Sequence, residues 1–226
     1  MDIRFDAATL THEAGTALHP LTLSLVERRI GVIGLNGSGK TSFARLIAGL
    51  TKPSAGHVFL HGLDTVADAD ALRGRTGFIF QNPANQIVLP IIRDDIALGL
   101  KSLKLSKAET EAKVGAVLAR LGIPHLADRR PHELSGGELQ LAALAAVLVS
   151  EPQLVIFDEP TNQLDLKNRA RVMDAIAGLN EQAIVISHDL ALIEGFERVL
   201  VFDAGMLAFD GAATEAVSAY REIALR

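Results

Sequence analysis

Short apolar runs recur along the chain, and the spacing of their residues changes from one run to the next. In residues 3–5 and 21–25 apolar and polar residues alternate, which predicts strands with one buried face. Residues 154–157, 183–186 and 199–202 are apolar throughout, as expected of parallel strands that are covered on both faces. The chain is therefore predicted to contain strands of both kinds.

Segments with helical spacing separate these runs. Helices are predicted over residues 41–50 and 169–179. Between them, Ser106 and Glu109 form the capping-box pattern S-x-x-E at the start of another helix. Buried strands that alternate with helices indicate a doubly wound α/β core. The helical stretch from about residue 83 to residue 133 is expected to lie beside this core as a subdomain.

Apolar residues make up 49% of the 226 residues, so a membrane span has to be considered. The longest apolar run covers residues 141–149, whereas a spanning helix needs about 20 apolar residues. The N-terminus has no basic segment followed by an apolar block, so no signal peptide is expected. Cysteine is absent, which excludes disulfides and fits the cytosol. We expect a chain that does not cross the membrane and is soluble when isolated.

The charge balance argues against a nucleic-acid-binding protein. The chain has 22 basic and 27 acidic residues, a net charge of −5, and its basic runs are no longer than pairs such as Arg129 and Arg130. A mildly acidic chain without a basic patch is a poor partner for a phosphate backbone. Aromatic residues make up 4% of the chain and tryptophan is absent, so a base-stacking platform is not expected either.

Residues 34–41, GLNGSGKT, match the pattern G-x-x-x-x-G-K-[ST] and follow a strand predicted over residues 29–33. The glycines let successive backbone N–H groups turn toward an anion, and the following helix adds its positive N-terminus. Lys40 is expected to reach the β- and γ-phosphates of a nucleotide, and the Thr41 hydroxyl is expected to bind Mg²⁺. The predicted nucleotide contacts are Asn36, Gly37, Ser38, Gly39, Lys40, Thr41 and Ser42.

Two carboxylates follow the apolar run at residues 154–157. Because ligands bind at the carboxyl ends of strands in open α/β sheets, Asp158 and Glu159 are candidates for the same site. Asp158 is expected near the Mg²⁺ that Thr41 binds. Glu159 is expected to polarise the attacking water as a general base. The alternative is an exposed acidic pair at a strand end, and the phosphate loop argues against it.

A second candidate anion site lies at residues 134–138, LSGGE, before a strongly helical run. Ser135, Gly136 and Gly137 could cap this helix and present backbone N–H groups to an anion. The phosphate loop already cradles the γ-phosphate of its own nucleotide. The second helix terminus therefore indicates a site that serves the nucleotide of a partner chain.

These segments resemble the motifs of ATP-binding cassette (ABC) ATPases, and they occur in that family's order. LSGGE resembles the signature motif. Gln81 matches the Q-loop glutamine, residues 162–165 match the D-loop, and His188 matches the switch histidine. The resemblance covers nearly the whole chain. It implies an ATPase that hydrolyses ATP by in-line attack of water on the γ-phosphate.

The resemblance also implies the fold and the domain organisation. We expect one ABC ATPase domain over residues 1–226 with an α/β P-loop NTPase core. Residues 1–82 and 151–226 would form this core together with an N-terminal antiparallel β region. Residues 83–150 would form an inserted α-helical subdomain that carries the signature motif.

The family pairs head to tail, so the resemblance implies a homodimer, or a pair with another ATPase subunit, that holds two ATP molecules at its interface. The implied catalytic residues are Lys40, Gln81, Glu159 and His188. The implied Mg²⁺ ligands are Thr41, Gln81 and Asp158. The implied ATP contacts made in trans are Ser135, Gly136, Gly137 and Glu138.

The sequence departs from the family pattern at several positions. His12 stands where an aromatic residue commonly stacks on adenine, and a histidine ring can stack as well. Leu141 replaces the arginine that commonly follows the signature. Asn162 and Gln163 stand in the D-loop where small residues are common. None of these departures removes a catalytic group.

Residues 81–86, QNPANQ, resemble the Q-x-P-x-x-Q pattern of energy-coupling-factor (ECF) transporter ATPases, where this short helix touches the coupling helix of a membrane subunit. The apolar residues 87–92 are either a groove for that partner helix or ordinary subdomain core. The resemblance implies a peripheral subunit on the cytoplasmic face of the inner membrane. Its partners would be an integral coupling subunit and a substrate-binding membrane subunit.

ECF ATPases serve the uptake of vitamins and of nickel or cobalt ions. The short segment after residue 202 favours the biotin-uptake type. Two other functions remain open from the residues. One is a soluble ABC ATPase, for example in iron–sulfur assembly. The other is a nucleotide or small-molecule kinase, which also uses a phosphate loop but needs neither LSGGE nor His188.

Overall fold

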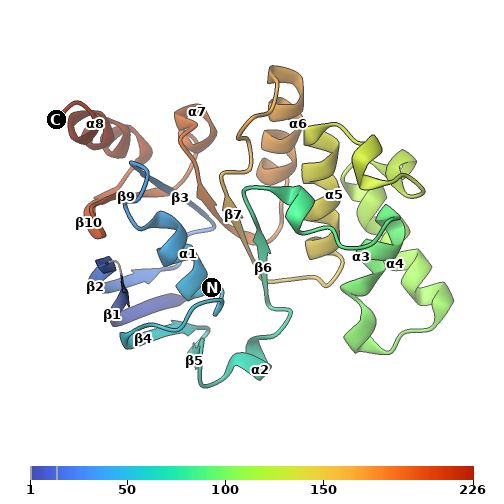
Figure 1. The fold of residues 1–226 in the computed structure, drawn as a ribbon, viewed down its shortest axis with the longest axis horizontal. Helices are drawn as coiled ribbons and strands as arrows, with labels where there is room; N and C mark the ends of the chain where they lie inside the picture. The colour runs from blue at the N-terminus through green and yellow to red at the C-terminus, as the bar shows by residue number, and fades with distance from the viewer. Residues whose placement is uncertain (1, 14) are drawn as a thin grey trace.

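The computed structural model describes residues 2–13 and 15–226, which form two sheets with a helical lobe beside them (Figure 1). The larger sheet has the strand order β10-β9-β3-β8-β7-β6. Its strands are β3 (Arg29–Gly34), β6 (Thr76–Ile79), β7 (Leu154–Asp158), β8 (Gln182–Ile186), β9 (Arg198–Asp203) and β10 (Met206–Gly211). Neighbours from β9 to β6 are parallel, whereas β10 is antiparallel to β9.

The apolar runs predicted as strands covered on both faces are confirmed. Every residue of β7 and β8 is buried. Ile184 and Ile186 of β8 pack with helix α1 (Lys40–Ile47) on one face of the sheet. Ala183 and Val185 pack with α5 (Gly136–Leu148) and α6 (Leu166–Ala177) on the other. Because successive side chains of a strand point to opposite faces, a strand between two helical layers has to be apolar throughout.

The smaller sheet is antiparallel, with the order β2-β1-β4-β5. It consists of β1 (Ile3–His12), β2 (Gly15–Leu25), β4 (Ala55–Leu60) and β5 (Leu63–Asp64). The strands predicted at residues 3–5 and 21–25 are only the ends of β1 and β2. The pairing of β1 shifts register between Phe5 and Ala8, and Ala7 has a φ of 46°. Such a bulge interrupts the alternation of apolar residues, which hid the length of β1 in the sequence.

Helix α1 lies between the two sheets (Figure 1). Its Phe43 ring stacks on Phe5 of the small sheet at 4.9 Å between ring centroids. On the other side, the same ring meets Phe202 of the large sheet at 5.1 Å. All three rings are fully buried. The phosphate loop that precedes α1 is therefore anchored by the helix that joins both sheets.

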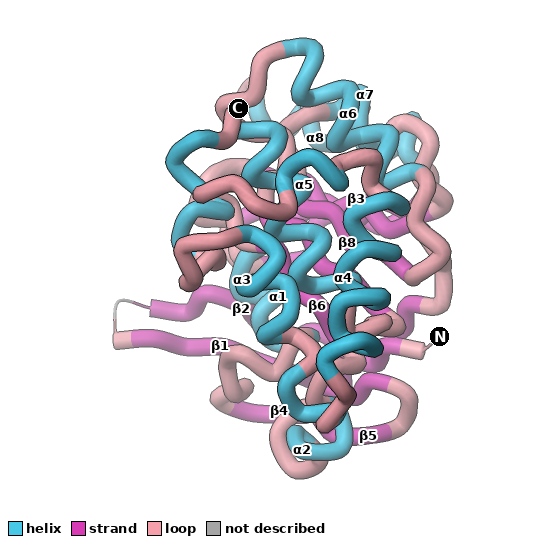
Figure 2. The backbone as a smooth tube through the Cα atoms, turned by 90° about the vertical axis from the view of Figure 1, so that its right-hand side faces the viewer, coloured by secondary structure: helices cyan, strands magenta, loops and turns pink. Residues whose placement is uncertain are grey.

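The helical lobe contains α3 (Ile92–Leu98), α4 (Lys107–Arg120) and α5, which lie in front of the strands in Figure 2. The predicted capping box at the start of α4 is confirmed, since Ser106 N donates to Glu109 Oε2 at 2.8 Å and Glu109 N donates back to Ser106 Oγ at 3.3 Å. The apolar segment 87–92 is only partly core, and a groove for a partner helix stays a prediction. Ile92 is buried in the core of the lobe, whereas Val88 is 71% exposed.

The remaining helices are α2 (Ala69–Leu72), α6, α7 (Leu190–Ile193) and α8 (Ala213–Ala224). Helix α6 begins three residues before its predicted start because Asp165 caps it, accepting a hydrogen bond from Asn168 N at 2.8 Å. Strand β10 and helix α8 were not predicted. No residue of β10 is fully buried, and the N-cap residue of α8, Ala212, provides no side-chain cap, so neither element carries a strong sequence signal.

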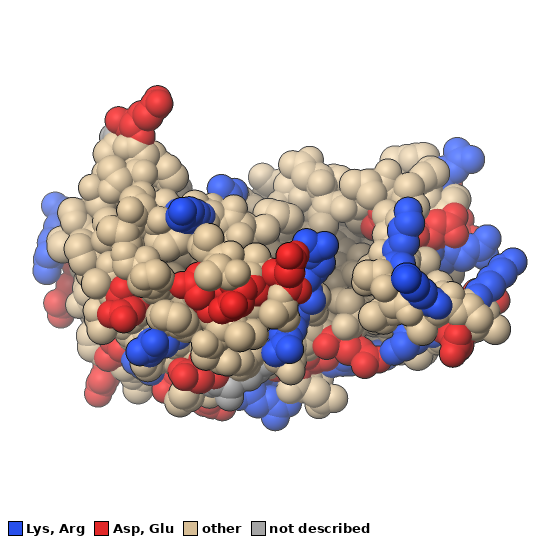
Figure 3. All heavy atoms as spheres, turned by 90° about the horizontal axis from the view of Figure 1, so that it is seen from below, with Lys and Arg blue, Asp and Glu red and all other residues tan. Residues whose placement is uncertain are grey.

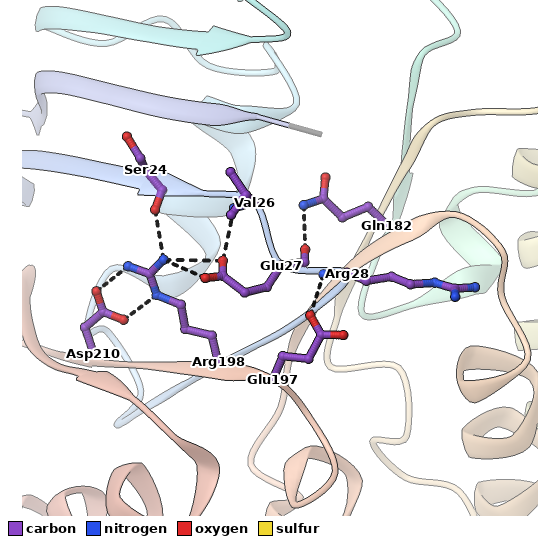
Figure 4. Close-up of polar contacts among 8 residues, drawn as sticks. All are labelled: Ser24, Val26, Glu27, Arg28, Gln182, Glu197, Arg198 and Asp210. Atoms are coloured by element: carbon purple, nitrogen blue, oxygen red, sulfur yellow. Dashed lines mark hydrogen bonds and ion pairs between the residues drawn. The ribbon is translucent and has the colours of Figure 1, made fainter.

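Arg198 joins the small sheet to the edge of the large one (Figure 4). Its guanidinium group forms two hydrogen bonds of 2.6 Å with the carboxylate of Asp210 on β10. It also donates to Glu27 Oε1 at 3.1 Å and to the Ser24 carbonyl oxygen at 2.9 Å. The hydrogen bonds to Asp210, followed by the neighbouring negative charges, hold the pKa of Arg198 above its usual range.

We expect Arg198→Met to lower the free energy of unfolding by about 2 kcal/mol or more, because hydrogen bonds to charged groups are strong and the two carboxylates would lose their cation. The Glu27 and Asp210 side chains are only 24% and 28% exposed. Urea unfolding followed by circular dichroism measures the change. Arg73→Met is the control, because Arg73 and Asp70 form an exposed pair expected to contribute less than about 1 kcal/mol. Equal losses in both variants would contradict a special role for Arg198.

On the face shown in Figure 3, basic and acidic side chains are interspersed. Across residues 2–13 and 15–226, no helix is both long and apolar enough to span a bilayer. The same part of the chain contains no cluster of three or more histidine and carboxylate side chains arranged to hold a metal ion.

Candidate active site

A cavity of about 550 Å³ opens above the start of α1, where several strands of the large sheet end. Its lining residues are Ala17, Asn36, Gly37, Ser38, Gly39, Lys40, Thr41, Ser42, Gln81, Asp158, Glu159, Asn162 and His188. The structure therefore brings together the phosphate-loop residues, both carboxylates, Gln81 and His188. These residues come from segments far apart in the sequence.

The phosphate loop runs from the end of β3 to the start of α1, and two of its glycines are required by close contacts. A Cβ atom on Gly34 would lie 2.2 Å from the Phe202 carbonyl oxygen. A Cβ atom on Gly39 would lie 2.6 Å from the Ala17 carbonyl oxygen, and Gly39 has a φ of 100°. No side chain caps α1 at Gly39, so the first N–H groups of the helix remain available for an anion.

Lys40 is 7% exposed, and its Nζ donates to the carbonyl oxygens of Gly34 and Leu35 at 2.8 and 2.9 Å. Burial lowers the pKa of Lys40, while the carboxylates of Glu159 and Asp158 act in the opposite direction. An anion in the cavity would offset the cost of burying this charge. The position of Lys40 thus suits the binding of phosphate oxygens.

Thr41 and Asp158 are in direct contact in the cavity lining. The Thr41 hydroxyl donates to Asp158 Oδ2 at 3.1 Å and lies 3.3 Å from Oδ1. Burial raises the pKa of Asp158 despite this hydrogen bond. A buried carboxylate beside a hydroxyl is a set of hard oxygen donors of the kind that Mg²⁺ prefers. The residues present therefore fit a magnesium ion bound next to phosphate oxygens.

Glu159 and His188 form a second pair in the cavity. His188 Nε2 lies 3.0 Å from Glu159 Oε1 and 3.1 Å from Asn36 Oδ1. The backbone N–H of His188 also donates to Glu159 Oε2 at 3.2 Å. Burial raises the pKa of Glu159, and burial followed by the charge of Lys40 lowers the pKa of His188. A carboxylate with a raised pKa, held on both oxygens, is suited to accept a proton.

Two lining residues were not predicted as site residues. Asn162 belongs to the segment that resembles the D-loop, and its position three residues after Glu159 is a signal that could have placed it in this site. Ala17 lies on β2, and its carbonyl oxygen packs against Gly39 of the phosphate loop and against Gly205 between β9 and β10. No side-chain chemistry marks such a backbone contact in the sequence.

His12 is not among the residues that line the cavity. It lies at the end of β1, is exposed and pairs with Gly15 of β2. The hairpin of these two strands projects from the side of the molecule (Figure 2). The hairpin approaches the phosphate loop through Ala17, not through His12.

The four predicted trans contacts begin helix α5 and do not line the cavity of their own chain. Ser135 and Glu138 form a capping box, since Ser135 N donates to Glu138 Oε2 at 2.9 Å. These hydrogen bonds hold the pKa of Glu138 below its usual range. A Cβ atom on Gly137 would lie 2.5 Å from the Asn168 side chain, so only glycine lets α5 pack against α6 here. Gly136 and the Ser135 side chain are exposed.

A protein-family model described as "ABC transporter" matches residues 18–162, which is more than half of the chain. The chain belongs to the ABC transporter family. This membership confirms the predicted ABC ATPase fold. It also makes the chain an ATP-hydrolysing transporter subunit, which rules out the kinase alternative.

Curated relatives agree with this assignment. A protein of Rhizobium etli named "Biotin transport ATP-binding protein BioM" is 63% identical over 224 residues, which covers 99% of this chain and 100% of the relative. A protein of the same name from Rhodobacter capsulatus is 41% identical, covering 94% and 91%. The "Energy-coupling factor transporter ATP-binding protein EcfA1" of Halalkalibacterium halodurans is 36% identical, covering 81% and 68%. The predicted resemblance to ECF ATPases is therefore confirmed.

Solved structures of ABC proteins have the same fold. The cbiO1 protein of Clostridium perfringens, described as part of the transporter complex cbiONQ, superposes with a TM-score of 0.85 at 27% identity, covering 99% of this chain and 94% of that chain. The ATP-binding cassette MJ0796, described as a dimer in a post-hydrolysis state with ADP and Pi, superposes with a TM-score of 0.84 at 26% identity, covering 93% and 98%. ABC ATPases thus dimerise and work with membrane subunits, and this chain is an ATPase subunit of an ABC transporter of ECF type.

Proposed function

We propose that this chain energises the uptake of biotin as the ATPase subunit of an ECF-type transporter. The observation that carries the proposal is full-length similarity, at 63% identity, to a protein named for biotin transport. The cavity that gathers Lys40, Asp158 and Glu159 supports the ATPase role. Neither of the BioM relatives nor EcfA1 is named for cobalt, nickel or iron–sulfur assembly, so these alternatives are not favoured.

In the proposed reaction, Lys40 and the free N–H groups at the start of α1 bind the β- and γ-phosphates of ATP. Glu159 accepts the proton of the attacking water, and His188 holds the Glu159 carboxylate in place. Gln81 is proposed to contact the water or the metal from the end of β6. Thr41, Gln81 and Asp158 would hold Mg²⁺, which neutralises charge on the phosphate oxygens when bound.

The proposed active form is a head-to-tail dimer. In its own chain, the Ser135 end of α5 does not reach the cavity, yet Ser135 and Gly136 are exposed at a helix N-terminus. Such a terminus favours an anion. We propose that it closes over the γ-phosphate held by the partner, with Ser135, Gly136 and Gly137 making the contacts. Glu138 would act mainly by holding Ser135 through the capping box.

The membrane partners would bind near residues 81–86. Asn82 caps the short 3-10 helix Pro83–Asn85, accepting a hydrogen bond from Ala84 N at 3.1 Å. Val88 follows with 71% of its surface exposed. An exposed apolar side chain beside a short helix suits the docking of a coupling helix. We propose a location at the cytoplasmic face of the membrane on this basis.

The test is purification of the tagged chain from membranes of cells that express it, followed by identification of the bound integral subunits. We expect a coupling subunit and a substrate-binding subunit, and a reconstituted complex that takes up labelled biotin only with ATP. Uptake of another vitamin or a metal ion in place of biotin would overturn the proposal that biotin is the substrate. A stable complex without membrane proteins would overturn the transport role.

We expect His12→Ala to raise the Kd for ATP by about 5-fold, because stacking of an aromatic ring on a base contributes about 1 kcal/mol or more. The Kd for GTP should rise to a similar extent, since stacking does not depend on which base is bound. Fluorescence titration with labelled nucleotides measures both values. His57→Ala is the control, because His57 lies in the same sheet, is exposed and pairs with Asp64. An unchanged Kd for ATP in His12→Ala would remove His12 from the base contact.

A further inference from the structure

The position of His188 depends on a short segment between β8 and α7. Strand β8 ends at Ile186 and α7 begins at Leu190, so His188 lies on neither element. Its side chain is 41% exposed, and its ring reaches Glu159 and Asn36 from this segment. A residue on a connecting segment needs anchors outside the helix and strand hydrogen bonds if it is to stay in place.

Besides the hydrogen bonds from His188 N to Glu159 Oε2 and from Leu192 N to the Asp189 carbonyl oxygen, three contacts hold the segment, and one of these three comes from a distant side chain. The backbone N–H of Ser187 donates to the Val32 carbonyl oxygen at 3.1 Å. The backbone N–H of Asp189 donates to Ser187 Oγ at 2.9 Å. The third contact is an ion pair between the carboxylate of Asp189 and the guanidinium group of Arg169 on α6.

Asp189 is strongly dependent on this ion pair. Its side chain is 12% exposed, and within the described chain its Oδ2 atom is buried without a hydrogen-bond partner. A buried carboxylate that loses its cation pays the desolvation cost without compensation, so it moves toward water. Because Asp189 follows His188 directly, such a movement would displace the His188 ring from Glu159.

Arg169 belongs to the first turn of α6, which also contacts the signature motif. Its backbone N–H donates to the Asp165 carbonyl oxygen at 2.8 Å, and Asp165 caps the helix through Asn168. The Asn168 side chain packs directly on Gly137, where a Cβ atom would lie 2.5 Å away. The first turn of α6 therefore has two contacts. One is with α5, whose start is the proposed trans site, and the other is with the segment that carries His188 in the same chain.

We propose that Arg169 is a positioning residue for ATP hydrolysis, which holds His188 against Glu159 through Asp189. Because Asn168 on the same turn packs on Gly137, this contact couples the signature helix of a chain to the switch histidine of that chain. The inference rests on the proposed role of His188 in hydrolysis. Within each chain, the proposed contact links the cavity for that chain's own ATP to the helix end that would contact the partner's ATP.

The test compares Arg169→Met, Arg169→Lys and Asp189→Asn, with Lys167→Met as the matched control on the exposed side of the same turn. We expect Arg169→Met to lower kcat roughly 10- to 100-fold, since small displacements of catalytic groups have effects of this size. The KM for ATP should change less than about 3-fold, because the phosphate loop is untouched. Arg169→Lys should restore part of kcat, as a cation remains without the planar guanidinium geometry.

Two further readouts distinguish positioning from a general loss of stability. In the double variant Arg169→Met with Asp189→Asn, the loss of kcat should be close to that of one single variant, because both changes break the same contact. Hydrogen exchange of nucleotide-free protein should accelerate over residues 187–190 in Arg169→Met and remain unchanged in α1. This measurement does not require hydrolysis. If Arg169→Met fails to fold, Arg169→Lys and Asp189→Asn carry the same comparison.

Unchanged kcat and exchange in Arg169→Met, or additive losses in the double variant, would overturn the inference. A wild-type protein that binds ATP without hydrolysing it would instead overturn the proposed role of Glu159 and His188. The exchange experiment would still decide whether Arg169 holds the His188 segment. The two failures are therefore distinguishable.

Discussion

Replacing Glu159 with glutamine is expected to lower kcat by about 10²- to 10⁴-fold, which is the usual contribution of a general base. Glutamine has nearly the same shape, and its amide oxygen can still accept the hydrogen bond from His188 N. It cannot take a proton from water. Because Lys40 and Thr41 are unchanged, ATP binding should persist and an ATP-bound dimer should accumulate.

Phosphate release at saturating ATP measures kcat, and gel filtration with ATP measures the dimer. Glu222→Gln is the matched control, since Glu222 is an exposed residue of α8 far along the chain from the cavity residues. Its activity should equal that of the wild type. Substantial hydrolysis by Glu159→Gln would remove Glu159 from the role of base.

The second large effect is expected for Ser135→Arg, which should lower hydrolysis by at least about 100-fold while each chain still binds ATP. The exposed Ser135 side chain sits at the N-terminus of α5, and a long cation there would fill the space proposed for the partner's phosphate. Removing donors that stabilise a developing negative charge costs about 10²- to 10³-fold in rate. The ATP-dependent dimer should also be lost, which gel filtration of the variant with ATP would detect.

Ser106→Arg is a closely matched control because Ser106 caps α4 with the same capping-box geometry. Both substitutions remove an N-cap, which costs about 1 kcal/mol of stability. Only Ser135 lies in the proposed dimer interface, so Ser106→Arg should retain ATPase activity. Normal activity and normal dimerisation of Ser135→Arg would count against the sandwich of two chains around ATP.

Much of the site could be predicted because its motifs are local. The phosphate loop needs glycines, a lysine and a hydroxyl at set spacings, since successive N–H groups have to surround one anion. Asp158 and Glu159 follow an apolar strand, and strand ends of a parallel sheet meet at one edge. Here the structure brings all of these side chains to a single cavity.

Other predictions failed where long-range packing outweighs local pattern. The bulge at Ala7 hid the length of β1. Strand β10 is held by pairing with β9, so its own residues need not be buried. The role of His12 as a base contact stays a prediction: the tertiary structure places it outside the cavity lining, on the hairpin whose Ala17 contacts the phosphate loop.

The sequence by itself determined the chemistry of this protein, because phosphate binding, helix capping and buried strands each depend on residues that are close together in the chain. Only the tertiary structure decided which side chains from distant parts of the sequence contact each other. The contact of Glu159 with His188 spans 29 positions, and that of Arg169 with Asp189 spans 20. Contacts of this kind depend on how helices pack against the sheet, and no local pattern of apolar and polar residues specifies that packing.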